Sequence, residues 1–108
     1  MKMSYRFMRI LLFFDLPTIE KEDLKEYRCF RKFLIQNGFI MLQESLYVKM
    51  LLNSTSAENF ISKLKKNLPP KGLVQVINIT EKQFQKMQTL VGEYNSNMLD
   101  SDERIEIF

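Results

Sequence analysis

The sequence predicts an α+β domain in which two helices cover one face of an antiparallel sheet. Short apolar runs of strand-like composition alternate with longer amphipathic segments, and Pro or Gly marks most boundaries between them. The chain has 108 residues, which suits one compact domain with a limited buried core. A second apolar face would need a cover from outside the chain, so self-association is expected.

The first strand is expected over residues 5–14, whose centre from Ile10 to Phe14 is apolar without alternation. Such a run is typical of a central strand buried on both faces. The strand should stop before Pro17, which holds its predecessor extended and has no N–H to donate to a neighbouring strand. This places the carboxylate of Asp15 at the carboxyl end of a central strand.

The first helix is expected from Thr18, a candidate N-cap, to about residue 36, where Asn37-Gly38 ends it. Acidic residues in its first turns suit the positive end of the helix dipole. The apolar side chains of its inner face recur at spacings of three and four: Tyr27, Phe30 and Leu34. The other side of this helix is left for its basic residues.

A hairpin and a second helix should follow. Residues 39–41 and 46–52 have the composition of two short strands joined by a polar turn. Thr55 and Glu58 have the spacing of a capping box, and the helix that they begin should end in the Pro- and Gly-containing stretch 67–72. The apolar stripe of this helix consists of Phe60, Ile61, Leu64 and Leu68.

The last elements are a fourth strand over residues 73–79 and a short third helix capped by Thr80. That helix should close at Gly92 and carry apolar side chains: Phe84, Met87, Leu90 and Val91. Residues 93–103 are polar and expected to form a loop. Residues 104–108 alternate between polar and apolar side chains, as a short final strand does.

The predicted order is β-α-β-β-α-β with an appended short helix and strand, which is the ferredoxin-like arrangement. We therefore expect a ferredoxin-like domain over residues 1–92 and an acidic C-terminal segment over residues 93–108. In this layout the second face of the sheet has no cover, and the simplest solution is a homodimer that packs two sheets face to face. The final strand could add to the sheet edge of a partner.

Composition excludes several classes of site. The chain has no His and one cysteine, Cys29, which excludes His-based acid–base catalysis, Cys/His zinc sites and an internal disulfide. Cys29 is expected to have a packing or surface role. No apolar run is long enough for a signal peptide or a membrane span, so the expected location is cytoplasmic.

Charge is distributed unevenly along the chain. Residues 1–92 carry 15 Lys and Arg against 8 Asp and Glu, whereas residues 93–108 carry 1 against 5. A basic body favours a polyanionic partner. The basic residues form two clusters on and after the predicted helices: Lys25, Arg28, Arg31 and Lys32, then Lys63, Lys65, Lys66 and Lys71. They are either plain solvated faces or a track that binds the phosphate backbone of a nucleic acid without reading its sequence.

Asp15 is the acidic residue whose position most suggests a specific role. Desolvation at the end of an apolar strand makes an unpaired carboxylate energetically costly, so a partner for it is expected. Across a two-fold axis, two such carboxylates would repel each other unless a proton or a cation lay between them. Mg²⁺ is the natural occupant, since it accepts few protein carboxylates together with several waters, and it would support phosphodiester hydrolysis. The alternative is structural: Asp15 accepts a hydrogen bond in the turn before Pro17.

Four stretches, in this order and spacing, carry a family resemblance: Phe13-Phe14-Asp15-Leu16-Pro17, Tyr27-Arg28-Cys29-Phe30-Arg31-Lys32-Phe33-Leu34, Asn37-Gly38-Phe39 and Gln43-Glu44-Ser45-Leu46-Tyr47. The sequence resembles the small CRISPR-associated protein that partners the integrase subunit during spacer acquisition. The likeness extends to residues 80–84 and is greatest to the variants found beside Cas9-type systems.

The resemblance implies a ferredoxin-like homodimer that acts as a scaffold between integrase dimers on DNA. It also implies that Asp15 matches an Asp that binds a divalent metal in nuclease-active members. The chain departs from many members at Glu44, where they have Arg, which removes a positive charge near the expected metal site. Ser45 and Tyr47 are expected at the same end of the sheet, either to bind a phosphate or water or as ordinary turn and strand residues.

The leading hypothesis is therefore a CRISPR adaptation subunit that binds double-stranded prespacer DNA and bridges integrase subunits. The runner-up is a magnesium-dependent endonuclease that cleaves DNA or RNA through Asp15, as its main activity or a residual one. A toxin-like ribonuclease or an effector-binding regulator is the alternative from another class. The acidic segment 93–108 is the expected contact with the integrase.

Overall fold

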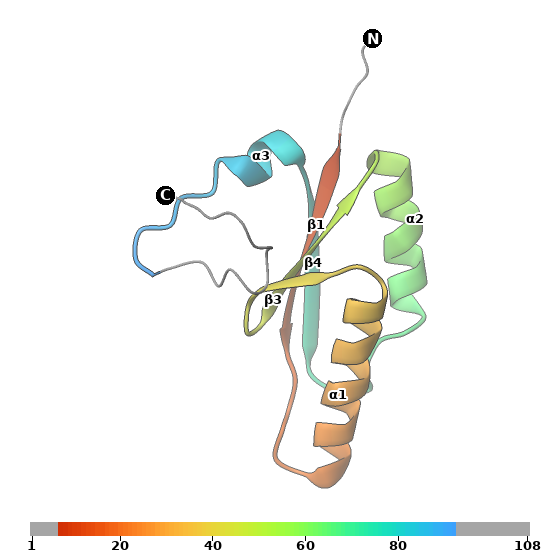
Figure 1. The fold of residues 1–108 in the computed structure, drawn as a ribbon. Coiled ribbons are helices and arrows are strands. Elements are labelled where there is room, and N and C mark those ends of the chain that lie inside the picture. Colours follow the sequence, from red (N-terminus) through yellow and green to blue (C-terminus); the bar gives the residue numbers. More distant parts are fainter. Residues whose placement is uncertain (1–6, 93–108) are drawn as a thin grey trace.

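A computed structural model describes residues 7–92 of the chain. Strand β1 (Met8–Asp15) leads into helix α1 (Lys21–Gln36), strands β2 (Ile40–Gln43) and β3 (Leu46–Leu51), helix α2 (Ser54–Lys65), strand β4 (Leu73–Thr80) and the short helix α3 (Glu81–Gln85), as Figure 1 shows. This order confirms the predicted ferredoxin-like arrangement with an appended helix. The predicted strand 104–108 and the acidic segment 93–108 lie outside the described residues.

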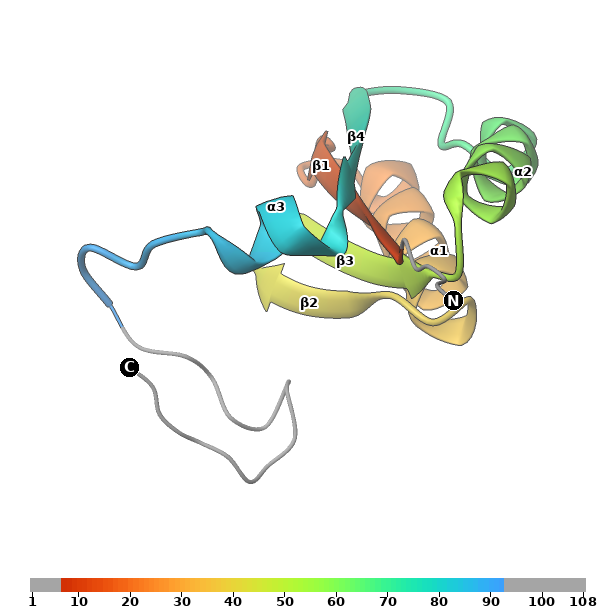
Figure 2. The ribbon, with the colours of Figure 1, turned by 90° about the horizontal axis from the view of Figure 1, so that it is seen from above.

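The strands form one antiparallel sheet in the order β2-β3-β1-β4, so β1 is paired on both sides. The long helices α1 and α2 lie together on one face of this sheet, and α3 lies on the other side (Figure 2). Alternate residues of β1 therefore meet different layers. Within residues 7–92, no helix combines the length and the apolar character needed to cross a bilayer.

The main core lies between the sheet and the two long helices. Its buried side chains come from β1, α1, β3, α2 and the turns beside them: Ile10, Leu12, Phe14, Leu16, Phe30, Leu34, Phe39, Tyr47, Ala57 and Leu64. Phe14 and Tyr47 meet edge to face, with 5.5 Å between ring centroids. Because each large apolar side chain buried here contributes about 1.5–3 kcal/mol, this layer provides most of the stability of the chain.

Helix α1 begins later than predicted. Thr18 is not its cap, because the segment after β1 must first cross from the sheet to the helix layer, and the first helical residue is Lys21. Glu20 is the N-cap, and its backbone N–H donates to the carboxylate of Asp23 at 3.4 Å. Asp23 is buried and also pairs with Lys71 at 3.2 Å, so an acid and not a hydroxyl supports the start of this helix.

Helix α2 begins earlier than predicted. Asn53 is its N-cap, and its side-chain oxygen accepts a hydrogen bond from the backbone N–H of Ser56 at 2.8 Å. The predicted capping box of Thr55 and Glu58 is therefore wrong. Asn is at least as favourable an N-cap as Thr, and Asn53 precedes Thr55 in the chain.

Helix α3 is shorter than predicted and ends well before Gly92. Thr80 caps it as predicted: its hydroxyl accepts from the backbone N–H of Gln83 at 3.0 Å, and the side chain of Gln83 accepts from the backbone N–H of Thr80 at 2.9 Å. Leu90 and Val91, which were expected on its apolar face, lie beyond the helix and are exposed.

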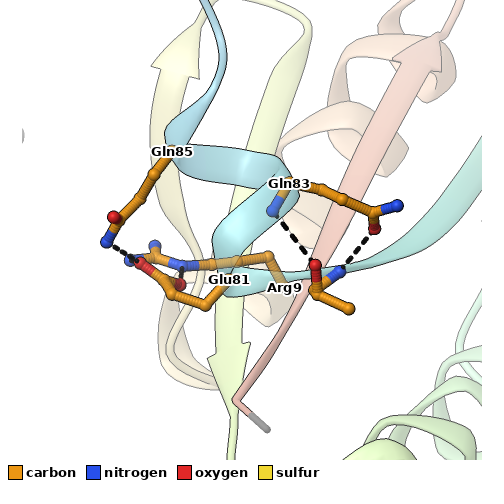
Figure 3. A network of polar contacts seen from close by, with 5 residues as sticks. Arg9, Glu81, Gln83 and Gln85 are labelled. Carbon is orange, nitrogen blue, oxygen red and sulfur yellow. Dashed lines mark hydrogen bonds and ion pairs between the residues drawn. The ribbon is translucent and has the colours of Figure 1, made fainter.

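An ion pair ties α3 to the start of β1 (Figure 3). Arg9 donates two hydrogen bonds to the carboxylate of Glu81, one of them 3.1 Å between Nη2 and Oε2. The guanidinium of Arg9 also lies 4.5 Å from the ring centroid of Phe84. These contacts hold Phe84 against a second apolar cluster on the face opposite to α1 and α2, formed by Leu11, Leu46 and Val48.

The carboxylate of Glu81 has a second donor, because the side-chain amide of Gln85 lies 2.9 Å from it. The hydrogen bond from Arg9 lowers the pKa of Glu81 below its ordinary value, with smaller support from Gln85 and from the positive charge of Arg9, and burial opposes the shift. A carboxylate whose pKa is lower in the folded protein stabilises the fold while it is ionised.

We predict that Glu81→Gln lowers the free energy of unfolding by about 1–2 kcal/mol at pH 7, because a partly buried, charge-assisted pair becomes a neutral one. The contribution of Glu81 is present above the ordinary carboxyl pKa and is lost as pH falls through its lowered folded value. Urea unfolding at pH 7 and at about pH 3 should therefore show the difference between the wild type and the variant shrinking at low pH.

The matched control is Glu58→Gln, which replaces an exposed carboxylate on α2 and should leave stability within about 0.5 kcal/mol at both pH values. A difference between the wild type and Glu81→Gln that has the same size at both pH values would contradict the assigned role of the ionised pair.

Candidate functional site

The face of the sheet opposite to α1 and α2 is apolar and only partly covered. We call it the open face and define it by its five large exposed side chains: Phe13, Ile40, Met50, Leu73 and Ile77. Phe13 is 41% exposed, so the expected burial of the first strand on both faces is not complete within one chain. The reason is that α3 is too short to cover more than one end of this face.

Asp15 is the last residue of β1 and lies on the open face, two residues after Phe13 and paired with Leu73. It is exposed, so the desolvation expected from the sequence is absent in the single chain. Within residues 7–92 its carboxylate has no hydrogen bond or ion pair, and the predicted structural alternative, a bond in the turn before Pro17, is not formed. This carboxylate is therefore accessible to a cation.

The carboxylate of Asp15 is an oxygen ligand of the kind that Mg²⁺ accepts, and a second chain could add another. Among the residues that the structure describes, no three acidic, His or Cys side chains come together as a metal site would require. Mg²⁺ accepts one or two protein carboxylates and keeps several waters. If a two-fold axis brought two chains together at this point, one Asp15 from each chain would supply two such carboxylates.

Backbone contacts hold the end of β1 in place. The N–H of Phe14 donates to the carbonyl of Ser45 at 3.1 Å, which puts the turn of Glu44 and Ser45 at this end of the sheet, as predicted. Gly72 packs against the same end with a φ of +95°, and a Cβ there would lie 2.7 Å from the carbonyl oxygen of Asp15. Only glycine permits this approach, so the loop before β4 helps to fix the position of Asp15.

Tyr47 lies on the opposite face of the sheet from Asp15. It pairs with Leu12, its side chain is fully buried, and its hydroxyl accepts a hydrogen bond from Arg31 Nε at 3.0 Å. The suggestion that Tyr47 binds a phosphate is therefore wrong, because the strand register turns it toward α1. Burial raises the pKa of the Tyr47 hydroxyl, and the hydrogen bond and charge of Arg31 oppose that shift.

The predicted basic clusters lie on the outside of the molecule. All eight residues are exposed, and they come from α1, from α2 and from the loop that follows α2: Lys25, Arg28, Arg31, Lys32, Lys63, Lys65, Lys66 and Lys71. Both helices lie on one face of the sheet, as predicted. Three of these residues also have structural partners. Arg31 bonds Tyr47, Lys63 bonds Asn37, and Lys71 pairs with Asp23.

Acidic residues are almost absent from this part of the chain. Residues 27–80 contain 8 Lys and Arg but only two acids, Glu44 and Glu58. The acids of α1 are confined to its first half, where they suit the positive end of the helix dipole. The exposed side of the helix layer therefore has a net positive charge and a surface suited to a polyanion.

Comparison with known proteins identifies the family. The profile of the family described as "CRISPR associated protein Cas2" matches residues 8–87, which include every strand and helix described above. The chain belongs to the Cas2 family. This confirms the resemblance that the sequence motifs carry, and the ferredoxin-like order of the elements agrees with it.

Several curated relatives carry the name "CRISPR-associated endoribonuclease Cas2". The Cas2 protein of Treponema denticola is 46% identical over 100 residues, which are 93% of this chain and 99% of the relative. One from Streptococcus mutans strain UA159 is 47% identical over 98 residues, 91% of this chain and 90% of the relative. A more distant one, from Flavobacterium psychrophilum, is 35% identical over 105 residues, 97% of this chain and 91% of the relative.

We predict that Arg31→Ala lowers the free energy of unfolding by about 1–3 kcal/mol, because it leaves the buried hydroxyl of Tyr47 without its partner. Urea unfolding measures the loss. In a Tyr47→Phe background the same substitution should cost much less, since no hydroxyl is left unpaired. Arg28→Ala on the same helix is the control and should change stability by less than about 0.5 kcal/mol. Equal costs in both backgrounds would show that Arg31 acts through something other than this hydrogen bond.

Proposed function

We propose that this Cas2 family protein is a DNA-binding scaffold subunit of CRISPR adaptation, a homodimer that holds duplex prespacer DNA by its phosphates and bridges integrase subunits. The observation that carries the proposal is the exposed, acid-poor basic surface of α1, α2 and the loop after α2. Lys and Arg side chains there would neutralise phosphates without reading bases. Membership of the Cas2 family supports the link to CRISPR systems.

The homodimer is supported by the open face. Its exposed apolar side chains lie on a sheet that a second copy could cover, and such a contact resembles the core of a protein interface. The helix layer lies on the other side of the sheet and would stay accessible in that dimer. Two basic surfaces would then face outward from one two-fold body, which suits binding along a duplex.

The second candidate function is a magnesium-dependent endonuclease that acts through Asp15. Two observations favour it: the Asp15 carboxylate is exposed on the open face, and curated relatives are named endoribonucleases. Mg²⁺, when bound, would supply a hydroxide and stabilise charge on phosphoryl oxygens. The chain itself supplies the carboxylate, and the contacts of Phe14 and Gly72 hold the end of β1 that carries it.

Light scattering tests the dimer. At micromolar concentration the wild type should have twice the chain mass of 12.9 kDa. Phe13→Lys and Ile77→Lys should each give the mass of one chain, because both place a charge in a contact that must be desolvated. Ile19→Lys is the control, since Ile19 is also apolar and is 88% exposed but lies in the loop after β1. A wild type with the mass of one chain would contradict the proposal.

The salt dependence of DNA binding tests the basic surface. Replacing Lys25, Arg28 and Lys32 together by Ala should flatten the slope of log affinity against log salt by about two to three units, because each phosphate contact contributes about −0.9. Arg31 is kept, since it holds Tyr47. The loss should be similar for duplexes of about 30 base pairs with unrelated sequences. The control replaces Lys82 and Lys86, two exposed lysines at α3, and should keep the wild-type slope. An unchanged slope in the triple variant would rule out phosphate contacts by the basic residues of α1.

Asp15→Asn separates cleavage from scaffolding. The variant keeps the size of the side chain but loses the charge that binds the cation, so magnesium-dependent cleavage of DNA or RNA should disappear. Duplex affinity should not fall, because a carboxylate makes no attractive contact with phosphate. Glu44→Gln in the neighbouring turn is the control and should keep any cleavage. Full cleavage by Asp15→Asn would place the reaction elsewhere.

A further inference from the structure

Two lysine side chains converge on one asparagine at the carboxyl end of α1. The ammonium group of Lys49, from β3, donates to the backbone oxygen of Asn37 at 2.6 Å. That of Lys63, from α2, donates to the side-chain oxygen of Asn37 at 2.9 Å. Asn37 is the C-cap of α1, and its amide donates to the carbonyl of Phe33 at 2.8 Å, which fixes its orientation. Three elements therefore hold two positive charges in one place.

An aromatic ring supports both ammonium groups. The nitrogen of Lys49 lies 5.1 Å from the ring centroid of Phe60, and that of Lys63 lies 5.9 Å from it. The face of an aromatic ring attracts cations but brings no net negative charge. Phe60 thus restrains the two side chains without neutralising them.

The charge of this cluster is not balanced by the described part of the chain. The carboxyl end of a helix carries about half a negative charge, against two full positive charges here. Within residues 7–92 the ion pairs are Arg9 with Glu81 and Lys71 with Asp23, and neither reaches the cluster. Burial lowers the pKa of Lys49, and the positive charge of Lys63 lowers it further. Helix capping accounts for one ammonium group but not for two in close proximity.

We propose that Lys49, Lys63 and Asn37 form a binding site for a phosphate group of a nucleic acid backbone. Each ammonium group has further N–H donors beyond the one given to Asn37, and the oxygens of a phosphate accept hydrogen bonds from several directions. Lysine binds phosphate as a point charge, whereas the flat fork of a carboxylate is best matched by Arg.

This site rests on the proposed function and deepens it. Lys63 belongs to a basic cluster that the sequence already indicates, whereas Lys49 lies on a strand that alternates between the two faces of the sheet. The position of Lys49 extends the basic surface of the helix layer to the junction of α1, α2 and β3. Lys66, the exposed C-cap of α2, lies three residues after Lys63 and therefore continues this surface on the same side of the helix.

The direct test is NMR of the lysine ammonium groups in the full-length protein, with inorganic phosphate as the probe. Phosphate should shift the signals of Lys49 and Lys63 at a lower concentration than it shifts the signal of Lys86, an exposed lysine after α3. It should also raise the pKa of Lys49, because a bound anion offsets the charge of Lys63. Chloride at the same ionic strength should do neither. Signals of Lys49 and Lys63 that move no more than that of Lys86 would overturn the site.

A second measurement uses duplex DNA of about 30 base pairs. Lys63→Gln should flatten the slope of log affinity against log salt by about one unit, because one phosphate contact is lost. Lys63 is exposed, so the single variant should keep the fold. The Lys49→Gln/Lys63→Gln double variant is compared with the single variant only if urea unfolding shows that the double variant is folded. Lys86→Gln is the matched control. A slope unchanged by Lys63→Gln would contradict the site.

Failure of this site and failure of the proposed function give different results. If the α1 triple variant binds DNA normally while phosphate still selects Lys49 and Lys63, the α1 surface is wrong and the site stands. If the triple variant loses binding while phosphate selects neither lysine, only the site is overturned. A polyglutamate peptide that moves the same signals at lower concentration than phosphate would overturn the phosphate assignment in favour of a carboxylate partner.

Discussion

The central strand β1 carries apolar side chains on both faces, but the described chain has one layer of long helices to cover them. Ile10, Leu12 and Phe14 are buried under that layer, whereas Phe13 is left exposed on the other side. Because of this imbalance, the two faces of the sheet differ. One face packs against α1 and α2 in the main core, and the open face remains partly exposed to solvent. Asp15 lies at the end of the open face, and the basic residues lie outside the helix layer.

Helix α3 decides how much of the open face remains. A helix of five residues is too short to be stable by itself, so its place depends on its contacts. The capping box of Thr80 and Gln83 starts it, and the pair of Arg9 and Glu81 fastens it to β1. Together these contacts pack Phe84 against the cluster that contains Leu11. The helix ends soon afterwards, so it covers only one end of the open face.

Charged side chains are also unevenly distributed along α1. The acids of α1 gather at its amino end, where Asp23 supports the first turn and holds Lys71. At its carboxyl end the negative end of the dipole meets Lys49 and Lys63 and no carboxylate among the described residues. A strongly positive region thus lies at the junction of the helix layer, on the side of the sheet away from Asp15. The proposed backbone-phosphate site and the proposed metal site at Asp15 would therefore lie on different faces of this Cas2 family protein.

The sequence by itself determined the order of the elements and much of the core, because hydrophobic spacing and Pro or Gly boundaries are local properties. The spacing of Phe30 and Leu34 predicts their burial, and Pro17 predicts that a strand ends close to Asp15. The two basic clusters could also be predicted, since exposure follows from their position opposite the apolar stripes.

The tertiary structure decided what depends on register and on the path of the chain. A shift of one residue exchanges the faces of a strand, so only the observed pairing puts Tyr47 under Arg31 and Lys49 beside the helix layer. The caps at Glu20 and Asn53 depend on where the chain enters that layer, which a local pattern does not record. The meeting of Asn37, Lys49 and Lys63 joins three elements far apart in sequence, and no spacing predicts it because its cause is how the helices pack on the sheet.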